Sequence, residues 1–370
     1  MNKYSHKQIK DILRTRISSM KPDERLPSEA TLCKEFSVSR MTVNKIIISL
    51  VNDGFLYRMK GSGTFVKSPF GDKQPIKFLL PCPEYFMYDC TYNLRMLLCG
   101  ILRKTSKYGL QIDAVPVSKV NNPEKIDWGM LDDFSDENIV IVPGMWYREI
   151  FPFLRDRGCR TIFCDLYSET VKNYPAYFSD WLTLTMDTRR AMTEAVKFLA
   201  SRGRKKIAYV YDNYPVDDPK NTGYRDGLAA VGLELDPQMM IYTGNVDSYF
   251  ERLMNPSAEF DALLLASPLP ARQTMLLLNN SPRKAPDDFG ILVFGDHERL
   301  QNFIPPLSAV SIPHLEIGKR VADILIKNAF APGNMEFKTT IFERESLSKG
   351  AGTNPNSGLA VFDEENVFSF

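Results

Sequence analysis

A short basic segment near the start of the chain groups side chains that suit a polyanionic partner. Arg40, Thr42, Asn44 and Lys45 follow Ser39, a residue type that caps helices, so we expect all four near a helix N-terminus. Such side chains donate hydrogen bonds to phosphates and to base edges in the major groove of DNA. Their spacing predicts a surface that contacts nucleic acid.

A second group with the same chemistry lies in a glycine-rich turn. The runs 55–58 and 63–66 are apolar and are separated by a short polar stretch, a pattern typical of a β-hairpin. Glycines in such a turn let the backbone approach a phosphate or the minor groove. The hairpin residues that we expect to contact DNA are Lys60, Gly61, Ser62, Gly63 and Thr64.

Three helices are expected to position these groups. Apolar residues recur at helical spacing over 7–20, and Ser28 is a candidate N-cap for a second helix with Leu32 and Phe36 on its buried side. A third helix is expected from Ser39 to Asp53–Gly54. Two helices joined by a tight turn and followed by a hairpin predict a winged helix-turn-helix, with Ser28 included among the DNA contacts.

Charge distribution supports DNA over the alternative of a protein–protein module. Residues 1–70 contain 13 Lys and Arg against 6 Asp and Glu, a net charge of +7. The remainder contains 33 basic and 39 acidic residues, a net charge of −6. A basic front on an acidic body indicates that the two parts bind different partners.

Four phrases in this order and spacing resemble the winged-helix domain of GntR-family transcriptional regulators: LPSE, VSRMTV, LVNDGFLYR and KGSGTFV. The resemblance covers residues 3–67 and implies operator contacts from Ser39, Arg40, Thr42 and the pair Asn44 and Lys45. Many relatives carry Arg where this chain has Asn44. An asparagine at that position can read adenine through two hydrogen bonds.

Beyond a linker at 69–75, buried strands alternate with amphipathic helices for almost 300 residues. This alternation predicts an α/β fold with parallel sheets, divided into two lobes with a cleft between them. We therefore expect a DNA-binding domain at 1–68, a two-lobed domain at 76–348 and a tail at 349–370 that fits neither pattern.

Six phrases in the body resemble the effector-binding domain of LacI-type regulators and the periplasmic sugar-binding proteins: MDTRRAMTEAVKFLASRGRKKIAYVY, TGYRDGLAAVGLEL, FDALLLAS, ILVFGD, LSAVSIPHLEIGKRVADILI and FERESL. A GntR-like front on a LacI-like body is similar to the arabinose-responsive repressors of bacteria. The resemblance implies a small effector bound between the lobes.

Three polar residues match effector contacts of that family. Arg225 corresponds to an arginine that donates to sugar hydroxyls, Asp296 to an accepting carboxylate, and Asp187 to a polar position at the lobe border. Each also has a structural alternative: a surface arginine, a turn residue and a helix cap. A buried hydroxyl without a partner costs about 1–3 kcal/mol, so a donor and an acceptor are both needed for a sugar.

Further candidates follow from the ends of two expected strands. Ser267 stands where the family usually has Asn or Asp, and Pro268 and Pro270 after it remove two amide donors, which favours a different effector. Tyr85 and Trp146 offer apolar faces for a sugar ring, although most aromatic residues belong to the core.

These features predict a dimeric DNA-binding regulator, most simply a repressor of carbohydrate genes, that binds a double-stranded operator and a small sugar-like effector. A non-sugar effector such as a purine, amino acid or phosphate ester is the first alternative, and an enzyme using the cleft is the second. No cofactor or metal motif is present, and the six scattered cysteines are expected to be reduced thiols in the core. No run could span a bilayer, and the charged N-terminus does not resemble a secretory signal, so we expect a cytoplasmic protein.

Overall fold

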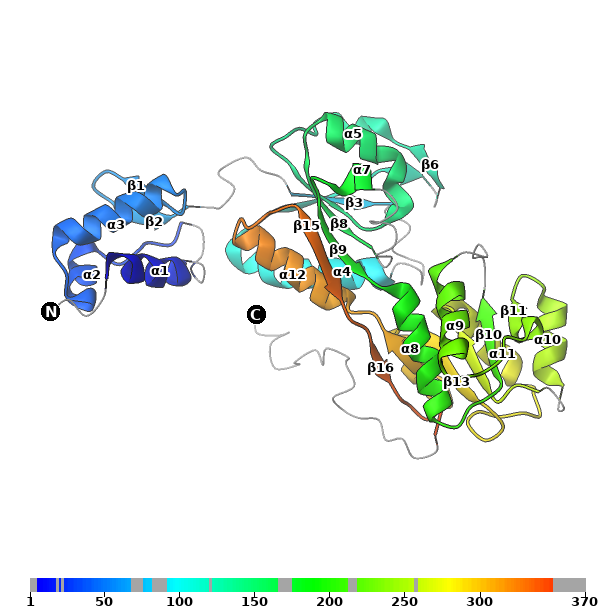
Figure 1. Cartoon of the computed structure of the whole chain (residues 1–370). Helices are drawn as coiled ribbons and strands as arrows, with labels where there is room; N and C mark the ends of the chain where they lie inside the picture. Colours follow the sequence, from blue (N-terminus) through cyan, green and yellow to red (C-terminus); the bar gives the residue numbers. More distant parts are fainter. Residues whose placement is uncertain are drawn as a thin grey trace. The chain divides into compact units, whose positions relative to one another are not determined.

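The computed structural model describes residues 5–17, 20, 23–67, 76–81, 92–119, 122–165, 175–211, 218–255 and 259–348 (Figure 1). The expected linker at 69–75 and tail at 349–370 lie outside these ranges. The described residues fall into two compact units, the first comprising 5–165, 175–184 and 314–335, and the second comprising 185–313 and 336–348. Each unit is described separately below.

The first unit begins with three helices and a two-stranded hairpin. These are α1 (His6–Ile17), α2 (Glu29–Phe36), α3 (Arg40–Asn52), β1 (Leu56–Met59) and β2 (Gly63–Val66). One apolar cluster includes Leu13, Phe36, Ile46 and Leu56, so the helices and the hairpin share a core. The strands pair antiparallel from Leu56 with Val66 to Met59 with Gly63. The predicted winged helix-turn-helix is therefore confirmed.

Local signals in the sequence fix the turns of this domain. The Ser28 hydroxyl accepts from the Thr31 amide, and the Ser39 hydroxyl accepts from the Thr42 amide, as N-caps do. Ser37 takes the left-handed conformation at φ 54° and so ends α2. The tight turn between α2 and α3 depends on that residue and on the cap that follows it.

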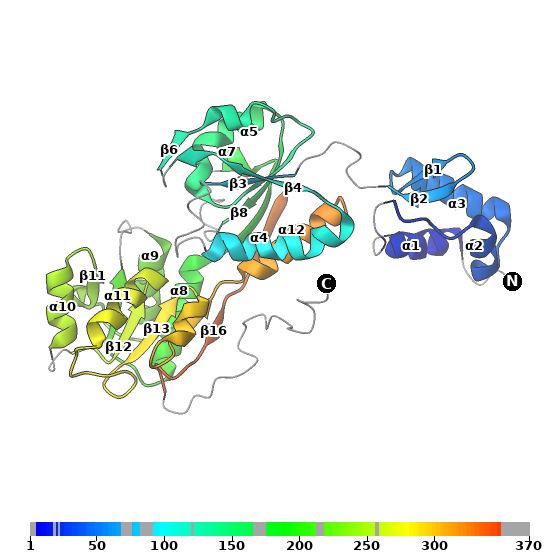
Figure 2. The same ribbon diagram turned by 180° about the vertical axis from the view of Figure 1, so that it is seen from behind.

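The same unit contains a six-stranded sheet in the order β15-β9-β8-β7-β3-β4. Four pairings are parallel: β3 with β4, β3 with β7, β7 with β8, and β8 with β9. Helices α4 and α12 lie on one face, and α5 and α7 on the other (Figures 1 and 2). The bounds are β3 (Ile76–Leu80), α4 (Tyr92–Thr105), β4 (Ile112–Pro116), β7 (Ile139–Val142), α5 (Phe151–Asp156), β8 (Arg160–Cys164), α7 (Pro175–Phe178), β9 (Leu182–Met186), α12 (His314–Ile326) and β15 (Gly333–Phe337). Shorter elements are η4 (Ser106–Tyr108), β5 (Ser118–Lys119), β6 (Asn122–Ile126), η5 (Trp128–Leu131) and η6 (Met145–Ile150), of which β5 and β6 form a separate antiparallel pair.

Helices α4 and α12 pack against each other at two glycines, Gly100 and Gly318. A Cβ on Gly318 would lie 2.1 Å from the Leu97 carbonyl oxygen, and one on Gly100 would lie 2.3 Å from that of Leu315. The backbones are therefore too close for any side chain at these two positions. Lys104 and Asp323 form an ion pair of 2.9 Å between the same two helices.

The second unit contains a six-stranded sheet in the order β11-β10-β12-β13-β14-β16, parallel except for the antiparallel edge pair β14–β16. Alternate strand residues enter two separate cores. Tyr209 and Leu264 pack with α8 and α9, whereas Val210 and Leu263 pack with α10 and α11. The bounds are α8 (Thr188–Ser201), β10 (Ile207–Tyr211), α9 (Pro219–Ala230), η7 (Pro237–Met239), β11 (Met240–Tyr242), α10 (Val246–Met254), β12 (Ala262–Leu265), α11 (Pro268–Leu278), β13 (Gly290–Phe294), η8 (Glu298–Asn302), β14 (Ser308–Ser311) and β16 (Thr340–Phe342).

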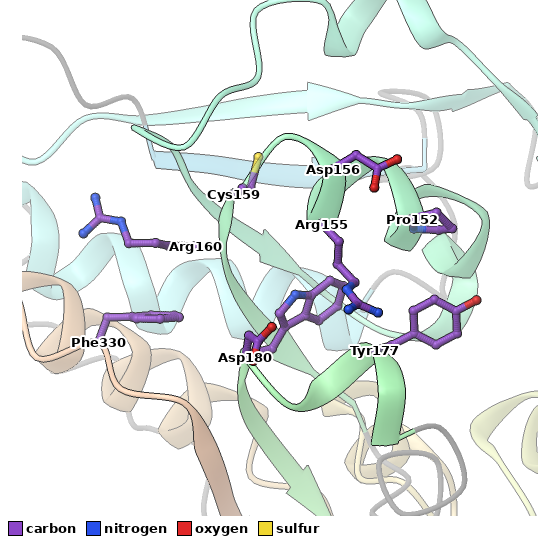
Figure 3. A pocket seen from close by; sticks show the side chains of 10 residues that line it. Pro152, Arg155, Asp156, Cys159, Arg160, Tyr177, Asp180 and Phe330 are labelled. Carbon is purple, nitrogen blue, oxygen red and sulfur yellow. The ribbon is translucent and has the colours of Figure 1, made fainter.

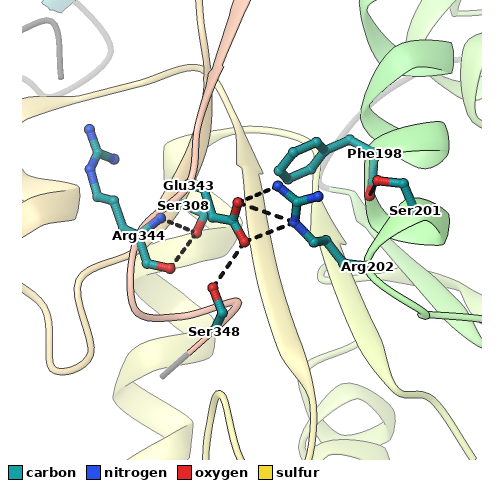
Figure 4. A network of polar contacts seen from close by, with 7 residues as sticks. All are labelled: Phe198, Ser201, Arg202, Ser308, Glu343, Arg344 and Ser348. Carbon is teal, nitrogen blue, oxygen red and sulfur yellow. Dashed lines mark hydrogen bonds and ion pairs between the residues drawn. The ribbon is translucent and has the colours of Figure 1, made fainter. Parts of the chain in front are cut away.

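A polar network ties the segment after β16 to this unit (Figure 4). The Arg202 guanidinium, at the end of α8, donates through Nε and Nη2 to the Glu343 carboxylate, with the shortest contact 2.6 Å. Ser348 donates to the same carboxylate at 2.9 Å. These hydrogen bonds and the positive charge of Arg202 hold the pKa of Glu343 below its usual value.

The predicted fold class, a winged helix-turn-helix with two parallel-sheet lobes, is confirmed, but some details were wrong. Helix α11 starts at Pro268, not at Arg272, because a proline at the first helical position lacks only an N–H that the helix does not use. Of the described cysteines, Cys159 and Cys164 are buried but Cys99 is exposed, so the core prediction fails for Cys99. Among the described residues, no helix is long and apolar enough to cross a membrane.

Candidate nucleic-acid interface and effector residues

The start of α3 presents its polar side chains to solvent. The Arg40 side chain is 84% exposed, Lys45 is exposed, and Thr42 and Asn44 are half-buried. The Ser39 hydroxyl caps the helix and also lies 2.9 Å from the Thr42 hydroxyl. A capped, accessible helix N-terminus with a cation beside it is a favourable place for a phosphate or a base edge.

The hairpin tip offers a second exposed group. Lys60, Gly61 and Ser62 are exposed, and the Ser62 amide donates to the Met59 carbonyl at 3.0 Å, which closes the turn. Gly61 has φ +81°, a conformation that favours glycine. Gly63 and Thr64 lie on β2 and are only half-exposed, so the tip itself is the more accessible part.

A network of charged and polar side chains joins α2, α3 and the wing. Glu29, at the first position of α2, accepts from Arg40 Nε at 3.2 Å and from Arg58 Nη2 at 3.0 Å. Arg58, on β1, also donates from Nη2 to the Asn44 Oδ1 atom at 2.7 Å. Two of the predicted DNA contacts, Arg40 and Asn44, are thus linked to Glu29 and Arg58, which the sequence analysis did not include.

In the second unit, Asp296 is engaged by a buried arginine. Its two carboxylate oxygens accept from Arg344 Nη1 and Nη2 at 3.0 and 2.9 Å, and the Arg344 side chain is 4% exposed. Arg344 also donates to the Leu307 carbonyl at 2.6 Å. The carboxylate expected to complement Arg225 is therefore already in a two-point ion pair with Arg344.

Arg225 lies on α9 with a half-buried side chain. Its Nε atom is buried and has no hydrogen-bond partner within the described part of the chain. Earlier on α9, the buried Lys220 donates to the Ala266 carbonyl at 3.1 Å, and its ammonium lies 5.3 Å from the ring centre of Phe294. Lys220 thus lies at the carboxyl ends of β12 and β13, the edge at which open α/β sheets bind ligands.

The other predicted effector residues fall at strand ends or outside the described residues. Asp187 follows β9 and caps α8, accepting from the Arg190 amide at 2.7 Å. Ser267 directly precedes α11, and Trp146 belongs to η6, which follows β7. Tyr85 lies outside the described residues. Asp187 therefore acts as a helix cap, which is the structural alternative given for it above. Its contact with an effector stays a prediction.

The first unit also has a hollow of 540 Å³ that includes none of the predicted effector residues (Figure 3). Arg155 and Tyr177 lie on one side of it, and Arg160 and Phe330 on the other. Burial raises the pKa of the Cys159 thiol in its wall to about 11, which disfavours a reactive thiolate. Across the described ranges, no group of three or more His, Cys, Asp or Glu residues could hold a metal ion.

Comparison with known proteins finds a matching family model in each of two parts of the chain. Residues 5–66 match the model described as "Bacterial regulatory proteins, gntR family". Residues 196–347 match the periplasmic binding protein-like domain. The chain thus combines a segment similar to the gntR family with a segment similar to the periplasmic binding protein-like domain.

Individual relatives match either the N-terminal part alone or a larger share of the chain. The HTH-type transcriptional repressor NagR of Bacillus subtilis is 48% identical over 64 residues, 17% of this chain and 26% of NagR. The arabinose metabolism transcriptional repressor of Halalkalibacterium halodurans is 25% identical over 236 residues, 60% of this chain and 59% of that protein. The chain thus covers less than two thirds of either relative. The solved structure of the transcriptional regulator CelR–cellobiose complex has a TM-score of 0.58 at 17% identity, covering 84% of this chain and 91% of that one, and so shares the fold.

Four residues of these two segments could contribute to the sites but were not predicted from the sequence. Arg58 and Arg344 stood inside the phrases LVNDGFLYR and FERESL but were given no role. Glu29 and Lys220 were not among the predicted site residues. The wing offered a signal for Arg58, because residues two apart in a strand lie on the same face and Arg58 therefore shares the face of the inward-facing Leu56.

Proposed function

We propose that the protein is a DNA-binding transcriptional regulator, a repressor of carbohydrate genes, controlled by a small effector in its body. The observation that carries the proposal is the exposed start of α3, with Arg40, Asn44 and Lys45 on a capped helix beside a basic wing. The gntR-family match over the same residues supports it, as do the names of two relatives, which are repressors. The predicted contacts from Ser28, Ser39, Thr42 and the wing tip are part of this proposal.

Salt dependence of DNA binding tests the proposal. Full-length protein should select a preferred duplex from a pool with a randomised core, and the affinity should fall steeply with salt because phosphate contacts release counterions. Arg40→Ala should weaken binding, whereas Arg252→Ala, on α10 of the second unit, should not. Equal affinity for selected and scrambled duplexes at every salt concentration would refute a sequence-reading function.

We further propose a homodimer that reads two half-sites. Two copies of the winged helix would recognise half-sites about one helical turn apart, or multiples of it. A selected motif with dyad symmetry and a sedimentation mass of twice the chain supports this arrangement. A single asymmetric site bound by one chain contradicts it.

The effector that we propose is a sugar bound by the LacI-like body. Support comes from the Nε atom of Arg225, which is buried and has no hydrogen-bond partner among the described residues. This atom can donate a hydrogen bond to a ligand oxygen. Support also comes from the name of one relative, an arabinose metabolism repressor, and from CelR, which was solved with cellobiose. Tyr85, Trp146, Asp187, Ser267 and Asp296 remain proposed contacts, of which Asp296 would act together with Arg344.

A thermal-shift screen against monosaccharides, disaccharides, nucleobases and amino acids tests the effector class. A ligand at a hundredfold its dissociation constant adds about 2.7 kcal/mol of stability, which is readily measured as a rise in melting temperature. A shift with a purine or amino acid, and none with any sugar, would favour the non-sugar alternative. Arg225→Ala should abolish the shift that the true effector produces.

We also propose where the domains begin and end and where in the cell the protein acts. We assign the DNA-binding domain to 1–68, the linker to 69–75 and the effector domain to 76–348, with a cytoplasmic location where DNA is accessible. We propose no catalytic role, since the relatives named above are regulators and not enzymes.

A further inference from the structure

The wing strand β1 brings an arginine to the face of α3 that carries the exposed polar residues. Arg58 belongs to β1, yet its guanidinium donates to Asn44 on α3 at 2.7 Å and to Glu29 on α2 at 3.0 Å. Asn44 lies four residues after Arg40, one turn along the same helix face. The Arg58 head group is thus held against α3, on the helix face that carries Arg40 and Asn44.

The hydrogen bonds of Arg58 leave its position well defined. Nη2 donates to both Glu29 and Asn44, which uses both hydrogens of that nitrogen. In the described part of the chain, Nε and Nη1 have no protein partner, and the side chain is 39% exposed. A guanidinium reads guanine through two parallel donors, and each such pair includes Nη2. Guanine must therefore replace Glu29 or Asn44 as an acceptor.

The carboxylate of Glu29 gives this cluster a second property. It accepts from Arg58 and from Arg40, so both cations are held by one anion on the surface proposed to contact DNA. A phosphate gains little from Arg58 while the guanidinium is neutralised by Glu29, and the carboxylate itself repels the DNA backbone. A base that presents two acceptors to the guanidinium compensates for the hydrogen bond that Arg58 loses to Glu29 or Asn44, whereas a base with one acceptor does not.

From this geometry we propose that Arg58 is a specificity-determining residue that reads one guanine in the major groove beside the start of α3. Glu29 and Asn44 are positioning residues: both hold the guanidinium against α3 in the free protein, and one of them keeps its hydrogen bond when guanine replaces the other. The charge of Glu29 also weakens the contact of Arg58 with phosphate. This inference rests on the proposed DNA-binding function and identifies one base pair, G·C, that the preferred operator must contain. It also assigns Arg58 to base reading, in contrast to Lys60 at the wing tip, whose point charge suits a phosphate.

Selection from a random-core duplex pool with full-length protein tests the inference. Wild type, Arg58→Ala, Arg58→Lys and Glu29→Gln are compared by sequencing the selected DNA and by titrating the wild-type motif and a variant with that G·C pair replaced. The matched control is the Arg16–Glu35 pair, a two-point ion pair that joins α1 to α2 in the same domain. Circular dichroism melting shows whether each variant folds.

Wild type should prefer the G·C pair by about 5- to 150-fold, and both Arg58 variants should reduce that preference to near onefold at this position alone. Arg58→Lys keeps the positive charge but lacks the two parallel donors of a guanidinium. It should therefore lose the preference for guanine while keeping any contact with phosphate, and this result can be read even if Arg58→Ala fails to fold. Glu29→Gln should raise affinity for all duplexes severalfold while lowering the preference. Glu35→Gln and Arg16→Ala should leave the motif unchanged.

Two results would overturn the inference, and they differ from failure of the proposed function. The first is a uniform loss across all sequences in Arg58→Ala, with the salt slope reduced by about one and the motif intact, which marks a phosphate contact. The second is an unchanged motif in Arg58→Lys. If wild type selects no motif at all, the DNA-reading function itself fails.

Discussion

Replacing Asp296 with asparagine tests whether its carboxylate serves mainly as the structural partner of Arg344 or is free to bind an effector. The carboxylate accepts from Arg344 at 3.0 and 2.9 Å, and the two side chains are only 13% and 4% exposed. Asp296→Asn leaves a buried guanidinium without its counter-charge. Breaking a buried pair by removing one partner costs about 3–5 kcal/mol, and the remaining bond from Arg344 to the Leu307 carbonyl places the expected cost near the lower limit.

Hydrogen exchange measured by mass spectrometry is the suitable assay, because tryptophan fluorescence does not report on the second unit. The three tryptophans, Trp128, Trp146 and Trp181, all belong to the first unit. Peptides covering β13 and β14 should exchange about a hundredfold faster in Asp296→Asn, since each 1.36 kcal/mol corresponds to a factor of ten.

Two variants calibrate this result. Glu343→Gln removes a neighbouring but more exposed ion pair, with Arg202 at 44% exposure, and should cost no more than about 1 kcal/mol. The double variant Asp296→Asn with Arg344→Met should be closer to wild type than Asp296→Asn alone, because the unpaired charge is gone. Unchanged exchange in Asp296→Asn would show that Arg344 does not hold the carboxylate, which would leave Asp296 free as a sugar acceptor.

Three further changes have expected outcomes. Ser39→Ala removes the cap of α3 and should cost about 1 kcal/mol in chemical denaturation while weakening DNA binding. Gly318→Ala forces a Cβ to within 2.1 Å of the Leu97 carbonyl, so the melting temperature of the first unit should fall by an amount equivalent to at least about 1–3 kcal/mol. The stabilisation from Glu343 is present above the usual glutamate pKa and is lost as the pH falls through its lowered folded pKa, so Glu343→Gln should match wild type in acid melts but be less stable near neutral pH.

Each of these outcomes has a control in the chain. Ser39→Thr retains a capping hydroxyl and should restore most of the loss seen with alanine. Ala329→Gly, beyond the end of α12, should leave the first unit close to wild type. A Glu343→Gln variant that differs from wild type equally at acid and neutral pH would contradict an electrostatic origin of the stabilisation.

Much of the fold could be predicted because local signals in the sequence agree with tertiary packing. Ser28 and Ser39 were recognisable as caps, and the uninterrupted apolar strands such as Ile139–Val142 are typical of parallel sheets covered on both faces. The start of α11 was harder to predict, because Pro268 is compatible both with a helix start and with a loop. Helix α12 returns to the first unit after β14 of the second, a connection that no local pattern reveals.

The candidate sites could be predicted only where one residue type carries the chemistry by itself. Arg40 and Lys45 were identifiable as exposed cations at a helix start. The link from Arg58 to Asn44 spans 14 residues and depends on how the wing folds back on α3, and that of Asp296 to Arg344 spans 48 residues. Side-chain pairs across such separations become visible only when the elements are placed in space.

The affinity of full-length protein for its selected duplex, measured with and without the sugar that raises its melting temperature, shows whether the effector domain controls DNA binding. Coupling between an effector site and a DNA-binding domain is typically about 1–3 kcal/mol, so we expect a change in Kd of about 5- to 150-fold. The change should disappear in Arg225→Ala, while that variant still binds the duplex. If no stabilising ligand changes the Kd for DNA, the proposal that effector binding controls DNA binding is contradicted.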